Sequence, residues 1–158
     1  MKESEIMSVE EPAIAPVRGR TNSPHRILVV DDNSDIRQLS VDVLADSGYD
    51  VEAAQDGAAG WEALQADDYD LVITDNKMPR MTGIEMIEKL RAAHMSLLVI
   101  MATGNLPAYE FARKPWLKPD ATLQRPFSND DLLATVKKIL HAGDGNDGRK
   151  ETLLPMYV

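Results

Sequence analysis

Ile27-Leu28-Val29-Val30 is a continuous apolar run that ends directly in a pair of acids, Asp31-Asp32. A run without alternating polar residues is typical of a strand that is buried on both faces, as in a parallel sheet. From Ser34 onward the apolar residues recur at helical spacing, and Gly48 follows where such a helix would end. This stretch therefore predicts a buried strand, an acidic strand end and a helix in direct succession.

The same alternation of strand and helix continues along the chain. Further short strands are predicted at residues 49–54, 71–73, 97–101 and 121–124, and further helices at 57–66, around 84–90 and after Ser128, which is expected to cap the last helix. Between Gly104 and Pro119, three prolines leave only Ala108–Lys114 for a helix of about two turns at most. Strands that alternate with helices imply right-handed βαβ units, so we predict an α/β fold whose parallel sheet carries helices on both faces.

The length of 158 residues fits one ordinary domain, because single domains most often have about 100–150 residues. Residues 1–24 mix prolines and glutamates without apolar periodicity, which predicts a disordered N-terminal tail. We expect the folded domain to span residues 25–141. Residues 142–158 begin with Gly, Asp and Asn, and are predicted to form a flexible C-terminal tail.

The composition excludes several classes of protein. The formal net charge of −9 repels phosphate backbones and anionic lipid, so we expect no direct DNA binding and no membrane association. Without cysteines the chain has no disulfide framework, thiolate zinc site or cysteine nucleophile. The longest apolar run, Leu97–Ala102, is far shorter than the ~20 residues that span a bilayer, and the N-terminus has no apolar signal-peptide core. We therefore expect a soluble, cytoplasmic protein.

Polar residues with a chemical use follow four of the predicted strands: Asp31 and Asp32, then Asp75, Thr103 and Arg125. Ligands of open parallel sheets bind beyond the carboxyl ends of the strands, so these side chains are expected to meet at one edge. Clustered carboxylate oxygens suit Mg²⁺, and an aspartate beside Mg²⁺ can attack a phosphoryl group. The alternative for the first acids is structural, because Asp32-Asn33-Ser34 could simply cap the first helix.

On four motifs the sequence resembles the receiver domain of bacterial two-component response regulators. The motifs are Val29-Val30-Asp31-Asp32-Asn33, Asp75-Asn76-Lys77-Met78-Pro79-Arg80-Met81-Thr82-Gly83, Met101-Ala102-Thr103-Gly104 and Arg125-Pro126-Phe127. The resemblance covers Arg26 to about His141. It implies a (βα)5 flavodoxin-like or CheY-like three-layer sandwich, with a five-stranded parallel sheet of order 2-1-3-4-5.

The resemblance also implies roles for individual residues. Asp75 would be the phosphoacceptor, Asp32 would bind Mg²⁺ directly, and Asp31 would bind it mainly through water. The backbone carbonyl of Lys77 would supply a further metal ligand. Thr103 would move to donate a hydrogen bond to the new phosphoryl group.

The sequence departs from the family at two positions. At the end of the fifth strand the family nearly always has lysine, whereas this chain has Arg125, whose planar fork is not equivalent to an ammonium. Arg125 could pair with a phosphoryl oxygen, or it could bind Asp75 beforehand and hold the site shut. Thr122 stands where the family usually has a Tyr or Phe, so the usual coupling of threonine to aromatic ring is not expected.

Two functions follow as hypotheses. In the first, the chain is a stand-alone response regulator that takes a phosphoryl group from a histidine kinase or phosphotransfer protein and signals to a downstream protein. In the second, it is a pseudo-receiver that binds partners without phosphate. We expect no enzyme, such as a Mg²⁺-dependent phosphotransferase or phosphatase that uses Asp75 on a free substrate, because no general acid–base residue follows Asp75 in an Asp-x-Asp arrangement. The sequence leaves open whether the chain forms a homodimer.

Overall fold

Five parallel strands form one sheet in the order β2-β1-β3-β4-β5. The structure is a computed structural model and describes residues 24–145. The strands are β1 (Arg26–Val30), β2 (Asp50–Ala54), β3 (Leu71–Thr74), β4 (Leu98–Thr103) and β5 (Ala121–Gln124). The predicted α/β class, parallel sheet and strand order are therefore confirmed.

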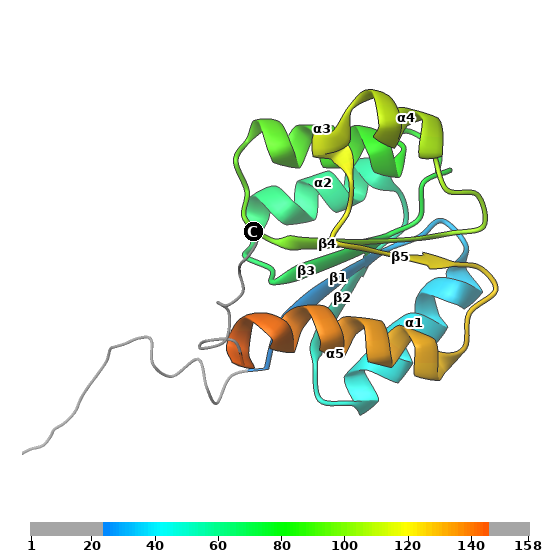
Figure 1. The fold of residues 1–158 in the computed structure, drawn as a ribbon. Helices are drawn as coiled ribbons and strands as arrows, with labels where there is room; N and C mark the ends of the chain where they lie inside the picture. Colours follow the sequence, from blue (N-terminus) through cyan, green and yellow to red (C-terminus); the bar gives the residue numbers. More distant parts are fainter. Residues whose placement is uncertain (1–23, 146–158) are drawn as a thin grey trace, which may run out of the picture.

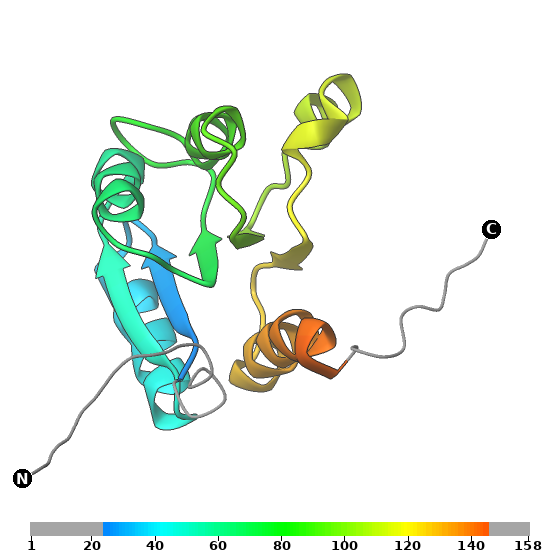
Figure 2. The same cartoon turned by 90° about the vertical axis from the view of Figure 1, so that its left-hand side faces the viewer.

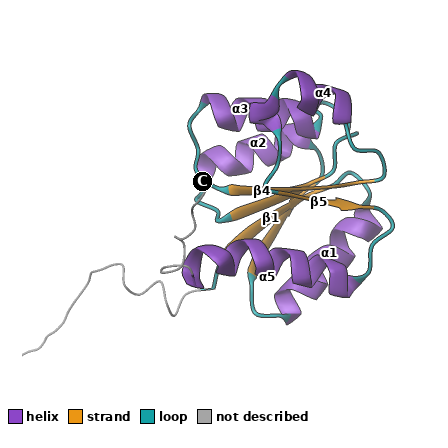
Figure 3. Cartoon of the chain, viewed as in Figure 1, coloured by secondary structure: helices purple, strands orange, loops and turns teal. Residues whose placement is uncertain are grey.

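Helices cover both faces of this sheet and give three layers (Figures 1 and 3). One face carries α1 (Ser34–Asp46) and α5 (Asn129–Gly145). The other carries α2 (Gly57–Ala66), α3 (Gly83–Ala92), α4 (Ala108–Arg113) and the 3-10 turn η3 (Pro115–Leu117). Figure 2 shows that α2, α3 and the α4–η3 segment follow one another across the sheet, from the β2 side to the β5 side.

The apolar run of β1 is continuous because its residues alternate between two separate cores. Leu28 and Val30 pack in the core beneath α2 and α3, whereas Ile27 and Val29 pack in the core beneath α1 and α5. All four side chains are at most 3% exposed. Helices on both faces thus remove the need for polar alternation, which is the reason that a short apolar run could be read as a central strand.

Local signals set the ends of the helices. The side chain of Asn33 accepts hydrogen bonds from the backbone N–H groups of Asp35 and Ile36, so Asn33 is the N-cap of α1. At α5, Ser128 Oγ accepts from Asp131 N at 3.0 Å, and Asp131 Oδ2 accepts from Ser128 N at 3.1 Å. The predicted cap is therefore present.

One predicted boundary lies inside a helix of the described structure. Helix α5 continues to Gly145, past the predicted end of the domain at His141, and where the domain itself ends stays a prediction. Apart from Pro24 and the end of α5, the predicted tails at 1–24 and 142–158 lie outside the described residues. The prolines restrict α4 to a short helix, as expected. Within residues 24–145, no helix has the length and apolar character needed to cross a bilayer.

Strand register brings the ends of β1 and β3 together. Val30 is paired with Thr74, and Thr74 is paired on its other side with Met101 of β4. The residues that follow these strands therefore emerge side by side at the carboxyl edge of the sheet. Loop closure behind β3 depends on a glycine, because a Cβ atom at Gly83 would lie 2.3 Å from the carbonyl oxygen of Asp75.

This close approach predicts the effect of adding one methyl group. Gly83→Ala is expected to lower the free energy of unfolding by about 1–3 kcal/mol, because backbone must shift to accommodate Cβ. Urea denaturation measures the change. Gly104→Ala is the matched control, because a Cβ there meets nothing within 4 Å. A Gly83→Ala protein as stable as the control would contradict the packing described.

Candidate functional site

Three carboxylates meet where β1 and β3 end. One carboxylate oxygen each from Asp31, Asp32 and Asp75 lies within 4.8 Å of the others. Asp31 is 4% exposed and Asp75 is 8% exposed, whereas Asp32 is exposed. Backbone hydrogen bonds to the sheet fix the two buried acids, since Asp31 N donates to Ala54 O and Asp75 N donates to Val30 O, both at 3.1 Å. The predicted convergence of these three acids is therefore observed.

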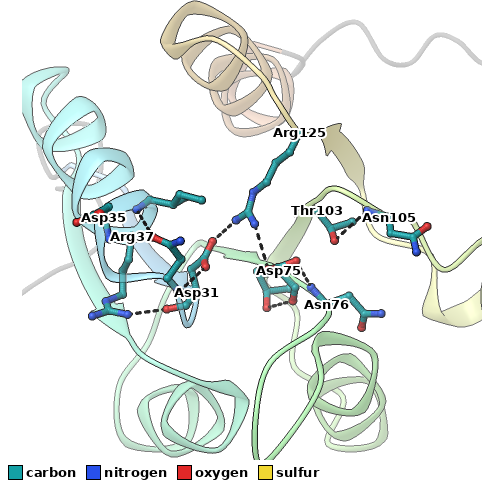
Figure 4. A network of polar contacts seen from close by, with 11 residues as sticks. Asp31, Asp35, Arg37, Asp75, Asn76, Thr103, Asn105 and Arg125 are labelled. Carbon is teal, nitrogen blue, oxygen red and sulfur yellow. Dashed lines mark hydrogen bonds and ion pairs between the residues drawn. The ribbon is translucent and has the colours of Figure 1, made fainter.

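Arg125 reaches into this cluster from the end of β5 (Figure 4). Its Nη1 donates to Asp75 Oδ2 at 3.1 Å, and its Nη2 forms an ion pair with Asp31 Oδ2. Its Nε atom is buried and has no hydrogen-bond partner among the described residues. The contact between Arg125 and Asp75 that the sequence left open is therefore present, and pairing of Arg125 with a phosphoryl oxygen stays a prediction.

The two buried carboxylates are held in the same way. Asp31 Oδ1 accepts a hydrogen bond from Asn33 N at 2.9 Å, and Asp75 Oδ1 accepts one from Asn76 N at 2.7 Å. In each case the other oxygen is bound by Arg125. A single guanidinium therefore bridges two acids whose remaining oxygens are already bound by backbone amides.

Burial dominates the electrostatics of Asp31. Desolvation raises the pKa of this carboxyl above its usual value, against the opposing effects of the Asn33 N–H group and the Arg125 guanidinium. The negative charge of Asp75 raises it further. The folded chain thus disfavours the ionised form of Asp31, even though a cation lies directly beside it.

Thr103 lies at the same edge, at the end of β4 (Figure 4), and Gly104 is the next residue along the chain. Thr103 is 3% exposed, and its Oγ1 accepts from Asn105 N at a long 3.4 Å. No heavy atom outside its chain neighbours lies within 4 Å of a Cβ placed on Gly104, so there is open space beside the threonine. Thr122 on β5 is exposed.

Lys77 lies in the loop between β3 and α3, which is closed by hydrogen bonds to Asn76. Asn76 O accepts from Gly83 N at 2.9 Å, and Asn76 Oδ1 accepts from Ile84 N at 3.0 Å. The ligand role of the Lys77 carbonyl stays a prediction. The chemistry of the donors fits Mg²⁺, because three carboxylate oxygens lie close together and this ion prefers oxygen ligands.

Sequence reasoning missed Asp56 and its partner Arg80. Asp56 is 3% exposed and accepts from Ala59 N at 2.8 Å as the N-cap of α2. Arg80 Nη2 lies 3.0 Å from Asp56 Oδ2. The hydrogen bond from Ala59 N, together with Arg80, lowers the pKa of Asp56. An Asp before an Ala-rich helix could have predicted the cap, but no sequence signal linked Asp56 to Arg80.

The raised pKa of Asp31 predicts how stability depends on pH. The penalty for ionising Asp31 is fully present above its folded pKa, and it disappears below the unfolded value of about 3.9. Asp31→Asn is therefore expected to increase the free energy of unfolding at pH 7, and the gain should shrink as the pH approaches 4. Urea denaturation across this range measures it. A variant less stable than wild type at pH 7 would mean that the Arg125 pair outweighs the cost of burial.

Comparison with known proteins gives one consistent result. The family described as response regulator receiver domain matches residues 27–137. Response regulator MprA of Mycolicibacterium vanbaalenii is 33% identical over 129 residues, which are 82% of this chain and 56% of that protein. Transcriptional regulatory protein DltR of Streptococcus agalactiae is 33% identical over 112 residues, covering 71% of this chain and 50% of that protein. The chain thus spans about half the length of these relatives.

Solved structures agree with this result. A CheY-like response regulator receiver domain protein from Methanospirillum hungatei is 30% identical, with a TM-score of 0.72 over 77% of this chain and 98% of that one. Response regulator TrrA from Thermotoga maritima, solved in complex with Mg²⁺-BeF, is 32% identical, with a TM-score of 0.65 over 73% of this chain and 98% of that one. On its sequence, its fold and the acids at its sheet edge, the chain belongs to the response regulator receiver domain family.

Proposed function

We propose that this chain is a response regulator that accepts a phosphoryl group on Asp75 in a Mg²⁺-dependent reaction. The observation that carries the proposal is the meeting of Asp31, Asp32 and Asp75 at one edge, with Arg125 between two of them. Uptake of phosphate and use of Mg²⁺ at an acidic pocket are general to receiver domains, and the family match spans all of these residues. TrrA, the related regulator from Thermotoga maritima, was solved with Mg²⁺-BeF.

In the proposed reaction, a carboxylate oxygen of Asp75 attacks the phosphorus atom of a phosphohistidine on a partner kinase or phosphotransfer protein. The new bond joins Asp75 oxygen to phosphorus, the phosphorus–nitrogen bond breaks, and the histidine leaves. Asp31, Asp32, Asp75 and the Lys77 carbonyl would hold Mg²⁺, which supplies positive charge where an anionic nucleophile meets an anionic phosphoryl group. The open space beside Gly104 supports entry of that group.

Two further side chains have proposed roles in the same step. The Thr103 hydroxyl would donate to a phosphoryl oxygen, because it already faces this edge and its one described contact, from Asn105 N, is long at 3.4 Å. Arg125 would release Asp75 and bind the phosphoryl group through its guanidinium. We further propose that this receiver domain signals in the cytoplasm through protein contacts. It would neither bind DNA directly nor turn over a free substrate as an enzyme.

Phosphorylation itself is tested by intact mass. Wild-type protein incubated with Mg²⁺ and a small phosphodonor should gain one phosphoryl group, because Asp75 is the acceptor. Asp75→Asn should gain none. Asp46→Asn, which changes an exposed carboxyl at the end of α1, is the matched control and should react like wild type. Equal modification of the Asp75→Asn protein would contradict the assignment.

A second candidate function, the pseudo-receiver, is favoured by one specific observation. Arg125 forms ion pairs with both Asp31 and Asp75, so part of the charge that a metal would neutralise is already paired by this side chain. In a pseudo-receiver these ion pairs replace phosphorylation and partners bind constitutively. Wild-type protein that gains no mass with any donor would favour this function over the first.

Replacing Arg125 by lysine measures how strongly the ion pairs restrain the site. A lysine ammonium is a point charge without the bridging fork. Arg125→Lys should therefore speed phosphorylation by the small donor about fivefold or more, as expected for the loss of roughly 1 kcal/mol of restraint. Stopped reactions analysed by intact mass give the rate. Arg91→Lys, at a guanidinium that binds the carbonyls of Trp116 and Lys118, controls for the chemical change and should have no effect. A rate unchanged in Arg125→Lys would contradict restraint by Arg125.

A further inference from the structure

The loop between β3 and α3 has an unusual backbone at its tip. Arg80 has a φ of +71°, in the left-handed region that residues with a side chain seldom adopt. Such a conformation is unfavourable for residues with a side chain, and it persists where the surrounding structure holds it in place. The contacts of Arg80 therefore indicate what fixes this loop.

Asp56 holds the Arg80 side chain. Arg80 Nε donates to Asp56 Oδ2 at 3.1 Å, and Arg80 Nη2 lies 3.0 Å from the same oxygen. The Asp56 side chain is 4% exposed, whereas that of Arg80 is 63% exposed. The buried carboxylate is itself fixed, because its Oδ1 caps α2 through Ala59 N. Asp56 is thus a rigid anchor, and Arg80 attaches the loop to it.

Met81, the residue after Arg80, packs on the N-terminal end of α2. A Cβ atom at Gly57 would lie only 2.1 Å from the carbonyl oxygen of Met81, so the loop backbone and the first turn of α2 are in direct contact. Nearer to Asp75 in the same loop, Met78 is 8% exposed and belongs to the core beneath α2 and α3. Lys77 therefore lies between the buried Met78 and Asn76, whose carbonyl oxygen closes the loop.

We propose that the Asp56–Arg80 ion pair positions the Lys77 carbonyl for the metal by holding the β3–α3 loop against α2. This inference rests on the proposed function, since it concerns the same metal site. Mg²⁺ demands near-ideal octahedral geometry, so a ligand on a mobile loop weakens binding more than a ligand that is already in place. Asp56 and Arg80 are positioning residues, and neither touches the metal.

Isothermal titration of unphosphorylated protein with Mg²⁺ tests the inference through affinity rather than activity. Arg80→Gly removes the cation while glycine adopts the positive φ without cost, and Asp56→Asn removes the charge while its amide oxygen can still cap α2. Each should raise the dissociation constant for Mg²⁺ by about three- to tenfold. The double variant should be no weaker than the weaker single one, and Arg80→Lys should restore part of the affinity.

The control and the opposing outcomes separate this inference from the proposed function. Lys114→Gln breaks another partly exposed ion pair, with Glu88 at 3.0 Å, and should leave Mg²⁺ affinity unchanged. Arg80→Gly and Asp56→Asn proteins that are less stable to urea but bind Mg²⁺ like wild type would overturn the inference alone. Wild-type protein that binds no Mg²⁺ would overturn the proposed function and the inference together.

Discussion

Asp31 and Asp75 share one guanidinium, and the chemistry of the whole sheet edge depends on this sharing. Both carboxylates are almost completely buried, and each has one oxygen bound by a backbone amide and the other by Arg125. One carboxylate oxygen of each lies within 4.8 Å of the other, and two like charges this close require a neutralising partner. The fold brings the acids together through the pairing of β1 with β3, and it brings their partner from the far strand β5.

The burial of these charged groups lowers the stability of the folded chain. Burial keeps the pKa of Asp31 raised despite its ion pair, and the Nε atom of Arg125 is buried without a partner among the described residues. Such a buried pair contributes little net stability, because desolvation offsets the attraction. A bound metal would offer the same carboxylates a better partner and free Arg125 for a phosphoryl group. Under the proposed function, arginine at this position would link metal binding to the state of the acceptor more tightly than a lysine would, because it bridges both acids.

Much of the fold could be predicted because single residues carry local signals. The apolar run of β1 predicted a strand covered on both faces, Ser128 and Asp131 predicted the cap of α5, and the prolines between Gly104 and Pro119 predicted a short α4. The extent of α5 could not be predicted, since Gly, Asp and Asn after His141 have a linker composition and the helix nevertheless continues to Gly145. Helix propensity is a weak predictor of the residue at which a helix ends, because tertiary context decides it.

The same distinction holds at the site. The meeting of Asp31, Asp32, Asp75, Thr103 and Arg125 at one edge could be predicted, since each lies within two residues of the end of a predicted strand and parallel strands end at one edge. The choice of Asp31 and Asp75 as joint partners of Arg125 could not, because it depends on side-chain geometry across three strands. The Asp56–Arg80 pair could not be predicted from the sequence either. Its members lie 24 residues apart, and the positive φ of Arg80 has no signal in the composition of the loop.

The proposed function requires that one positive partner at a time occupies the space between Asp31 and Asp75. The Arg125 Nε–H signal, followed by NMR while Mg²⁺ is added to the unphosphorylated protein, reports on this exchange. We expect this signal to shift in step with metal binding, as Arg125 leaves the two carboxylates. Saturation of the acids with Mg²⁺ while the Arg125 signal stays unchanged would contradict it.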